Sequence, residues 1–122
     1  MKEAGHLKLL IVEDSGPVRR LIKTLVADLA GEIHECSDGA EALAAYNWHQ
    51  PDFVLIDIQM GLLDGITATR RIKAADPAAR IIIVTDYDQP DLREAARQAG
   101  ACAYIVKENL LELVEFLRAK QA

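Results

Sequence analysis

The sequence predicts an α/β fold: a single doubly wound domain of five β-α units, with helices on both faces of a parallel sheet. Five short apolar runs alternate along the chain with five stretches of helical spacing. The runs are rich in Ile, Val and Leu and alternate little between apolar and polar residues, which is typical of strands covered on both faces. Such β-α alternation favours a parallel sheet with right-handed crossovers. A chain of 122 residues has the size of one domain with one core.

The expected strands are the apolar runs themselves. Each has the length of a strand rather than of a helix. Four runs are strong, and the second along the chain is weaker. In chain order, the predicted strands are Leu7–Val12, the weaker Glu32–Cys36, Phe53–Ile56, Ile81–Val84 and Ala103–Val106.

The first expected helix has the clearest apolar stripe. Ser15 can cap its first turn, Pro17 suits that turn, and Gly31 suits its C-terminal end. The stripe has the i, i+3, i+4, i+7 spacing of a helix that buries one face. Its members are Val18, Leu21, Ile22, Leu25, Val26 and Leu29.

Four more helices are expected between and after the later strands. The second follows Asp38, the third ends before Pro77, and the fourth has Asp88 as its cap and Gly100 as its stop. The fifth runs almost to the end of the chain. The second, third and fourth are predicted at about Ala40–Trp48, Gly65–Ala75 and Pro90–Ala99, and the fifth is marked by Leu110, Leu111, Val114 and Leu117.

Composition excludes several classes of partner. The 14 basic and 19 acidic side chains give a net charge of −5, which disfavours direct binding of nucleic acid. No segment is long and apolar enough to span a membrane, and nothing resembles a targeting signal. The two cysteines, Cys36 and Cys102, are expected to be buried, reduced thiols, so a cytoplasmic location is expected.

Polar side chains follow four of the predicted strands at the point where each strand ends. They are Glu13 and Asp14 after the first strand, Asp57 after the third, Thr85 after the fourth and Lys107 after the fifth. In a doubly wound sheet, ligands bind beyond the carboxyl ends of the strands. The sequence therefore predicts that three carboxylates, a hydroxyl and an ammonium group gather at one edge of the sheet.

This set of groups suits phosphoryl transfer to a carboxylate. Clustered carboxylates repel one another, and a hard divalent cation such as Mg²⁺ removes that cost. A lysine and a threonine can then contact different oxygens of the phosphoryl group. The arrangement can therefore form an aspartyl phosphate.

The sequence resembles the bacterial response-regulator receiver domain from about Leu7 to Leu117. The resemblance rests on Leu-Ile-Val-Glu-Asp at 10–14, Asp-Ile-Gln-Met at 57–60 with Asp-Gly at 64–65, Val-Thr at 84–85, and Tyr-Ile-Val-Lys at 104–107. It implies a flavodoxin-like fold with a five-stranded parallel sheet of order 2-1-3-4-5. It also implies that residues 1–122 form one receiver (response regulatory) domain without an output domain.

The resemblance implies a role for each matching residue of the acidic cluster. Asp57 would accept the phosphoryl group. Glu13 and Asp14 would hold Mg²⁺ with Asp57, and the backbone carbonyl of Gln59 would complete the protein ligands. The chain would then be a phosphoprotein that catalyses only its own phosphorylation and dephosphorylation, and not an enzyme in the usual sense.

The resemblance also implies the parts of a switch and its partners. Thr85 and Lys107 would contact the phosphoryl group, and Tyr104 would be the aromatic residue that changes rotamer as Thr85 moves. The donor would be a sensor histidine kinase or a phosphotransfer protein. The surface of the fourth helix, fifth strand and fifth helix would then control an output domain, a downstream protein or a phosphorylation-dependent homodimer.

The sequence departs from the family pattern at three positions. Glu108 replaces a common proline, so the peptide bond before it is expected to be trans. Gly61 also replaces a proline, which should loosen its loop. Asp86 stands where the family has a small residue, and its carboxylate is expected to slow phosphorylation. Gln59 and Tyr87 occupy the two variable positions that tune phosphoryl lifetime in the family.

Two other functions remain open at this stage. The chain could be a degenerate receiver that binds partners independently of phosphate, for which Asp86 is the supporting feature. A small Mg²⁺-dependent phosphohydrolase is the second alternative. The short connections leave little material for a substrate pocket, and no Gly-rich phosphate loop is present.

Overall fold

The computed structural model describes residues 5–59 and 64–121. Met60, which belongs to one of the family-like segments, and Gly61, which was expected to loosen its loop, lie outside these residues.

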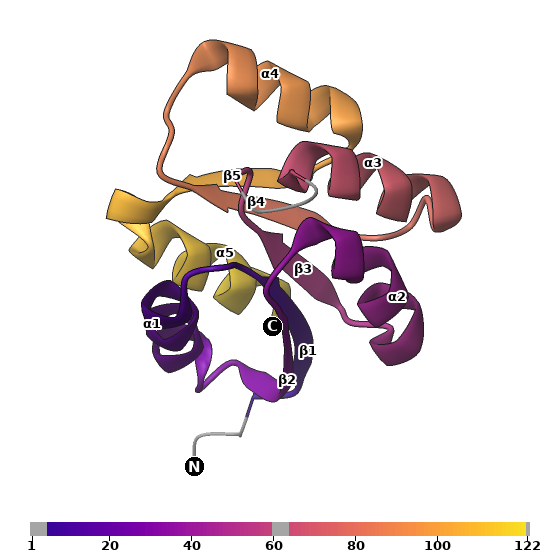
Figure 1. Ribbon diagram of the computed structural model, residues 1–122. Helices are drawn as coiled ribbons and strands as arrows, with labels where there is room; N and C mark the ends of the chain where they lie inside the picture. The colour runs from indigo at the N-terminus through magenta and orange to yellow at the C-terminus, as the bar shows by residue number, and fades with distance from the viewer. Residues whose placement is uncertain (1–4, 60–63, 122) are drawn as a thin grey trace.

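The strands form one parallel sheet in the order β2-β1-β3-β4-β5, as the resemblance predicted (Figure 1). Three strands have the predicted bounds, whereas β2 begins two residues earlier and β4 includes one more residue. The strands are β1 Leu7–Val12, β2 Ala30–Cys36, β3 Phe53–Ile56, β4 Ile81–Thr85 and β5 Ala103–Val106.

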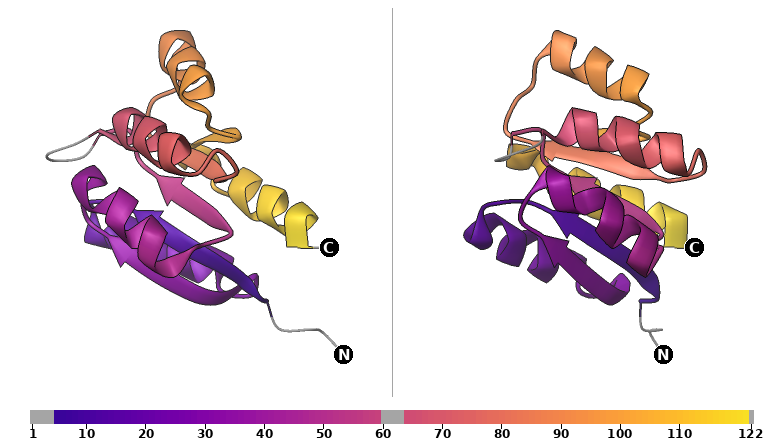
Figure 2. Two further views of the ribbon diagram at one scale, coloured as in Figure 1. Left: turned by 90° about the vertical axis from the view of Figure 1, so that its right-hand side faces the viewer. Right: turned by 45° about the vertical axis from the view of Figure 1, so that its right-hand side comes forward.

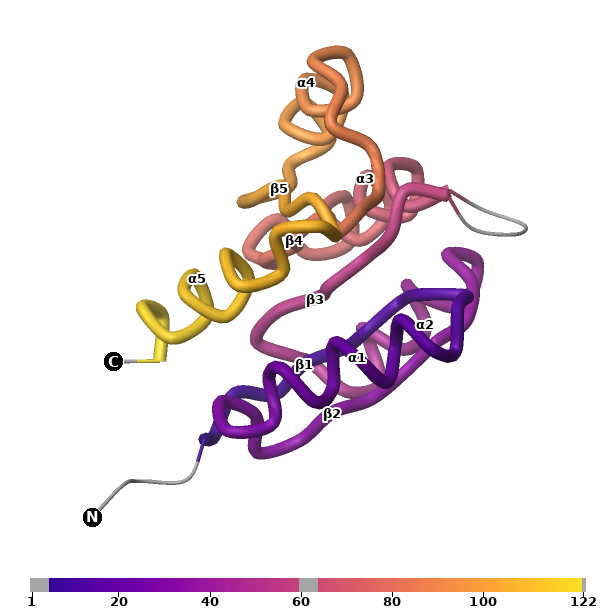
Figure 3. Tube along the Cα trace, turned by 90° about the vertical axis from the view of Figure 1, so that its left-hand side faces the viewer, coloured from indigo at the N-terminus to yellow at the C-terminus, as the bar shows by residue number. Residues whose placement is uncertain are grey.

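The helices cover both faces of the sheet. Helices α1 and α5 lie on one face (Figure 3), and α2, α3 and α4 lie one beside another on the other (Figure 2). A 3-10 turn, η1, joins β5 to α5. The bounds are α1 Gly16–Val26, α2 Gly39–His49, α3 Gly65–Ala75, α4 Pro90–Ala99, η1 Lys107–Asn109 and α5 Leu111–Gln121.

The pleat of each central strand sends alternate side chains into two separate cores. In β1, Leu10 and Val12 pack beneath α2, α3 and α4, whereas Leu9 and Ile11 pack beneath α1 and α5. Burying one such aliphatic side chain stabilises the fold by about 1.5–3 kcal/mol. The continuous apolar runs of the sequence therefore reflect strands that are covered on both sides.

Side-chain caps begin three of the helices. Ser15 Oγ accepts a hydrogen bond from the Val18 N–H at 3.3 Å, Asp38 accepts one from Ala40 at 2.8 Å, and Asp64 accepts one from Thr67 at 2.8 Å. Such caps satisfy amide groups that the first turn of a helix leaves without partners. The predicted cap at Ser15 is thus confirmed.

The predicted C-terminal end of α1 and the predicted cap of α4 are wrong, whereas the predicted stop of α4 is confirmed. Helix α1 ends at Val26, and Gly31 lies in β2, because the chain turns into the edge strand earlier than the apolar stripe suggests. Asp88 does not cap α4: the N-cap is Gln89, and the Asp88 carboxylate pairs with Arg93 Nε at 2.7 Å. Gly100 ends α4 in the left-handed conformation, with φ at 105°.

Three residues expected to be buried lie at the surface. Leu21 and Leu111 belong to predicted apolar stripes, but they are 49% and 69% exposed. In α5 Leu113 is buried instead, because it and not Leu111 has helical i, i+3, i+4, i+7 spacing with the buried Leu110, Val114 and Leu117. Cys36 is buried as predicted, whereas Cys102 is exposed because it lies in the bend that precedes the edge strand β5.

None of the helices in the described part of the chain is long and apolar enough to cross a membrane.

Tyr46 ties α2 to the end of α3. Its hydroxyl donates a 2.6 Å hydrogen bond to the Asp76 carboxylate, and burial, together with this contact, raises the pKa of Tyr46 to about 12. We expect Tyr46→Phe to lower the melting temperature by a few degrees, because one hydrogen bond is lost while the packing of the ring remains. Thermal unfolding followed by circular dichroism measures this shift. An unchanged melting temperature would show that water replaces the bond at no cost.

Candidate functional site

The carboxyl edge of the sheet brings the predicted site residues together. The parallel ladder continues one residue beyond two strands: the Glu13 N–H donates to the Cys36 carbonyl at 3.0 Å, and the Asp57 N–H donates to the Val12 carbonyl at 3.1 Å. Because β1 and β3 are neighbours, these hydrogen bonds fix Glu13 and Asp57 side by side. The backbone of the sheet thus positions both carboxylates.

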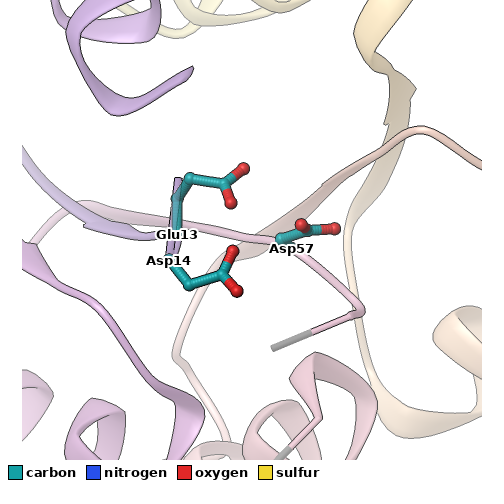
Figure 4. Close-up of side chains that lie close together, drawn as sticks. All are labelled: Glu13, Asp14 and Asp57. Carbon is teal, nitrogen blue, oxygen red and sulfur yellow. The ribbon is translucent and has the colours of Figure 1, made fainter. Parts of the chain in front are cut away.

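Three carboxylates form a cluster at this edge. Oxygen atoms of Glu13, Asp14 and Asp57 all lie within 4.8 Å of one another. Figure 4 shows the three side chains directed toward a common space beyond the ends of β1 and β3. Glu13 and Asp57 are buried, whereas Asp14 is exposed. Among the residues that the structure describes, no other acidic, histidine or cysteine group of this kind is found.

Glu13 is held in place through one carboxylate oxygen and its backbone. Its Oε2 accepts a 3.2 Å hydrogen bond from the Ser15 N–H, and its carbonyl accepts a 2.6 Å hydrogen bond from the Arg19 guanidinium. The other oxygen, Oε1, is buried and lies 2.7 Å from Lys107 Nζ. That oxygen therefore already faces a positive charge.

Lys107 places its ammonium group among the carboxylates. Its Nζ donates to Asp57 Oδ2 at 3.0 Å, and it lies 3.8 Å from Asp86 Oδ2. Only 11% of the lysine side chain is exposed. The peptide bond between Lys107 and Glu108 is trans, as predicted, since no described peptide bond is cis.

Burial and charge act in opposite directions on the pair of Glu13 and Lys107. Burial raises the pKa of Glu13, and repulsion from Asp57 raises it further, against the lowering effect of Lys107. Burial alone would lower the pKa of Lys107, but its bonds to Glu13 and Asp57 outweigh burial and raise it. The lysine therefore stays charged and compensates for two buried carboxylates.

The loop after β4 links the cluster to the outer face. Thr85 is buried at the end of β4, and its Oγ1 accepts a 3.4 Å hydrogen bond from the Tyr87 N–H. The Tyr104 hydroxyl donates to the Tyr87 carbonyl at 2.6 Å, while the Tyr87 hydroxyl donates to Gln59 Oε1 at 2.9 Å. Arg93 covers the Tyr104 ring at 4.7 Å. Tyr87 thus contacts Gln59 near the acidic cluster through its hydroxyl and Tyr104 on the outer face through its carbonyl.

Sequence reasoning missed three supports of the site. Neither the bond from the Arg19 side chain in α1 to the Glu13 backbone carbonyl nor the bond from the Tyr87 side chain to the Gln59 side chain has a signal in the sequence, because residue types and spacing do not specify such contacts. Gly65 belongs to the family-like Asp-Gly pair at 64–65, but the sequence does not show why glycine is needed there. A Cβ atom at Gly65 would lie 2.0 Å from the Asp57 carbonyl oxygen.

The donor set suits a hard divalent cation. All three side chains offer oxygen, which Mg²⁺ prefers, and the carboxylates of Glu13 and Asp57 are held buried at the edge of the sheet. Asp14, Gln59, Ile58 and Asp64 line an open depression beside the cluster, which leaves room for water ligands. The residues present therefore fit the predicted metal.

Comparison with known proteins identifies the family. The family model described as the response regulator receiver domain matches residues 9–118. The chain belongs to this family. As a receiver domain, it is a signalling module and not a conventional enzyme.

Curated relatives include single-domain and larger regulators. The receiver domain is 41% identical over 101 residues to the chemotaxis protein CheY of Bacillus subtilis, covering 82% of this chain and 84% of that protein. It is 40% identical over 101 residues to the transcriptional regulatory protein PdtaR of Mycobacterium tuberculosis, covering 82% of this chain and 49% of the relative.

Solved structures share the fold. A LuxR-family response regulator from Aurantimonas superposes with a TM-score of 0.84 at 30% identity, over 96% of this chain and 88% of that one. The CheX–CheY–BeF3–Mg complex from Borrelia burgdorferi contains a chain with a TM-score of 0.81 at 29% identity, over 93% and 90% of the two chains.

Proposed function

We propose that this receiver domain is a phosphoacceptor switch that takes a phosphoryl group on Asp57. The observation that carries the proposal is the contact of Lys107 Nζ with both Asp57 and Glu13, in a cluster that also contains Asp14. Two buried carboxylates alone would repel each other. The arrangement therefore suits a site that binds a cation and a negatively charged phosphoryl group. The donor is a phosphohistidine on a sensor kinase or a phosphotransfer protein.

The transfer is a displacement at phosphorus. A carboxylate oxygen of Asp57 forms the new P–O bond, the P–N bond of the phosphohistidine breaks, and the imidazole nitrogen keeps the electron pair. Mg²⁺, held by Glu13, Asp14, Asp57 and the backbone carbonyl of Gln59, supplies charge neutralisation when bound. Lys107 then pairs with a phosphoryl oxygen in place of the Asp57 carboxylate oxygen that it contacts in this structure.

The response is a shift between two arrangements of the loop after β4. A Thr85 hydroxyl that donates to the phosphoryl group moves the backbone of Tyr87, which holds the Tyr104 hydroxyl. The phosphoryl group favours the arrangement that it contacts better, so the population of that arrangement rises. The surface of α4, β5 and α5 then contacts an output domain, a downstream protein or a second copy. We place this switch in the cytoplasm.

The relative from Borrelia supports the metal and the acceptor. Its printed description names BeF3 and Mg in a complex of CheY with CheX. The present chain has a compatible acidic cluster, and its likeness to that chain covers nearly the whole domain.

We expect intact mass spectrometry to show one phosphoryl adduct after incubation with Mg²⁺ and acetyl phosphate. The adduct should be stable to acid, labile to hydroxylamine, and absent from Asp57→Asn and from metal-free samples, because an amide at this position offers no nucleophilic oxygen anion. Asp52→Asn is the matched control, since Asp52 lies at the opposite edge of the sheet before β3.

Two results would contradict this proposal. Absence of the adduct with both acetyl phosphate and a phosphohistidine donor, together with no binding of beryllofluoride, would favour the phosphate-independent interaction module. Magnesium-dependent turnover of small phosphoesters would favour the phosphohydrolase.

A further inference from the structure

Asp86 is a fourth carboxylate at the site, and the proposed transfer gives it no role. It follows Thr85 at the end of β4, and 72% of its side chain is exposed. It does not belong to the cluster of Glu13, Asp14 and Asp57. Its Oδ2 lies 3.8 Å from Lys107 Nζ, which is the charged contact that the structure gives it.

The position of Asp86 puts its charge near the acceptor Asp57. Lys107 Nζ lies 3.0 Å from Asp57 Oδ2, so the separation between Asp86 Oδ2 and Asp57 Oδ2 cannot exceed the sum of the two distances to Lys107. Asp57 and Lys107 are largely covered, whereas Asp86 is open to solvent. An exposed negative charge therefore stands close to the place where a donor meets Asp57.

The leaving group is the part of the donor most sensitive to that charge. In an in-line displacement the leaving group departs on the side of phosphorus opposite the attacking oxygen. The attacking oxygen belongs to the covered Asp57, so the leaving group departs toward solvent, where the exposed Asp86 carboxylate lies close to the site. A carboxylate there attracts a leaving group that bears positive charge and repels one that becomes an anion.

We propose that Asp86 is a specificity-determining residue that selects phosphoryl donors by the charge of their leaving group. It favours donors in which phosphorus is bonded to a protonated nitrogen, as in a phosphohistidine, over acyl phosphates. This inference rests on the proposed function, because it requires transfer to Asp57. Its consequence is a domain that takes phosphate more slowly from small acyl phosphates than it would without this charge, relative to its protein donor.

Two small donors separate the cases chemically. Protonated phosphoramidate transfers its phosphoryl group to the Asp57 carboxylate by breaking the P–N bond, and the nitrogen keeps the electron pair and leaves as neutral ammonia. Acetyl phosphate transfers the same group by breaking the P–O bond, and the oxygen keeps the electron pair and leaves as acetate anion. The products on the protein are identical, so only the leaving group differs.

The measurement is the ratio of the phosphorylation rates with acetyl phosphate and phosphoramidate, each followed by intact mass at one Mg²⁺ concentration. We expect Asp86→Asn to raise this ratio about tenfold, which corresponds to about 1.4 kcal/mol between the two transition states. Asparagine keeps the size of the side chain and removes its charge. The increase should shrink at high salt, because the exposed charge is screened.

Asp88→Asn is the matched control. Asp88 lies on the same loop, is exposed and pairs with Arg93, so its replacement makes the same change in net charge away from Lys107. We expect this variant to leave the ratio within twofold of the parent value. Asp86 could also change how well Lys107 contacts the phosphoryl group. Such an effect changes the rates with both donors alike, so it cancels in the ratio.

Two patterns would overturn the inference. One is an unchanged ratio in Asp86→Asn. The other is a steric pattern, in which Asp86→Ala speeds both donors equally and Asp86→Asn speeds neither. Failure of the proposed function is a separate outcome: the parent would then form no adduct on Asp57 with either donor.

Discussion

Replacing Gly65 with alanine is expected to slow phosphoryl transfer to Asp57 at least 100-fold and to destabilise the domain. The added Cβ atom would lie 2.0 Å from the Asp57 carbonyl oxygen, 2.7 Å from its carbonyl carbon and 3.1 Å from Ile58 Cα. All three are backbone atoms, so no side-chain rotation relieves the contact. Helix α3 or the segment that carries the acceptor must therefore move.

The reason for glycine at this position is proximity and not backbone conformation. Among the described glycines only Gly100 has a positive φ. The Gly65 N–H donates to the Ile58 carbonyl at 2.9 Å, which fixes the start of α3 against the residue that follows Asp57. A displacement of about 1 Å at a reacting group costs roughly 100-fold in rate, which gives the expected size of the effect.

The rate of adduct formation and the melting temperature measure this effect. Gly16→Ala is the matched control, because a Cβ atom there meets only the ends of flexible arginine side chains at 3.4 Å or more. We expect the control to phosphorylate at the parent rate. A Gly65→Ala variant with the parent rate would show that α3 shifts without moving Asp57.

Replacing Lys107 with methionine is expected to destabilise the folded state without metal by on the order of 3 kcal/mol. Methionine keeps the length of the side chain and removes the charge that lies 2.7 Å from Glu13 and 3.0 Å from Asp57. Two buried carboxylates are then left without a cation. We also expect phosphorylation to slow by about 100-fold, because the transferring group loses an electrostatic partner.

Magnesium distinguishes this effect from a loss of packing. A divalent cation supplies the charge that the variant lacks, so Mg²⁺ should raise the melting temperature of Lys107→Met more than that of the parent. Lys23→Met is the control, since Lys23 on α1 pairs with Glu35 on β2 at the surface, away from the site carboxylates. Equal metal responses in Lys107→Met and the parent would contradict the role assigned to the lysine.

The central elements could be predicted well from the sequence, because buried strands and helices are marked by apolar residues. Strands β1, β3 and β5 and helices α3 and α4 have the predicted bounds. Strand β2 was predicted two residues short, since the missed residues Ala30 and Gly31 are not buried and form no apolar run in this edge strand. The sequence could not show that Asp88 does not cap α4. Its carboxylate pairs with Arg93 instead, and this pairing depends on the path of the loop.

The site residues could be predicted from their places at strand ends, but the residues that hold them in position could not. Polar residues at strand ends must share an edge in a parallel sheet, and Glu13, Asp14 and Asp57 do lie together. Their roles in phosphoryl transfer stay predictions. The close approach of Gly65 to Asp57 depends on backbone positions to within tenths of an ångström, which residue types and spacing do not specify.

Tyr87 has a consequence for how such a domain can evolve. Its hydroxyl bonds to Gln59 at the mouth of the site, and its carbonyl holds Tyr104 on the outer face. A mutation that adjusts one contact also displaces the other, because both belong to one residue. Under the proposed function, we therefore expect substitutions at Gln59 and at Tyr104 to have coupled effects, because one residue contacts both.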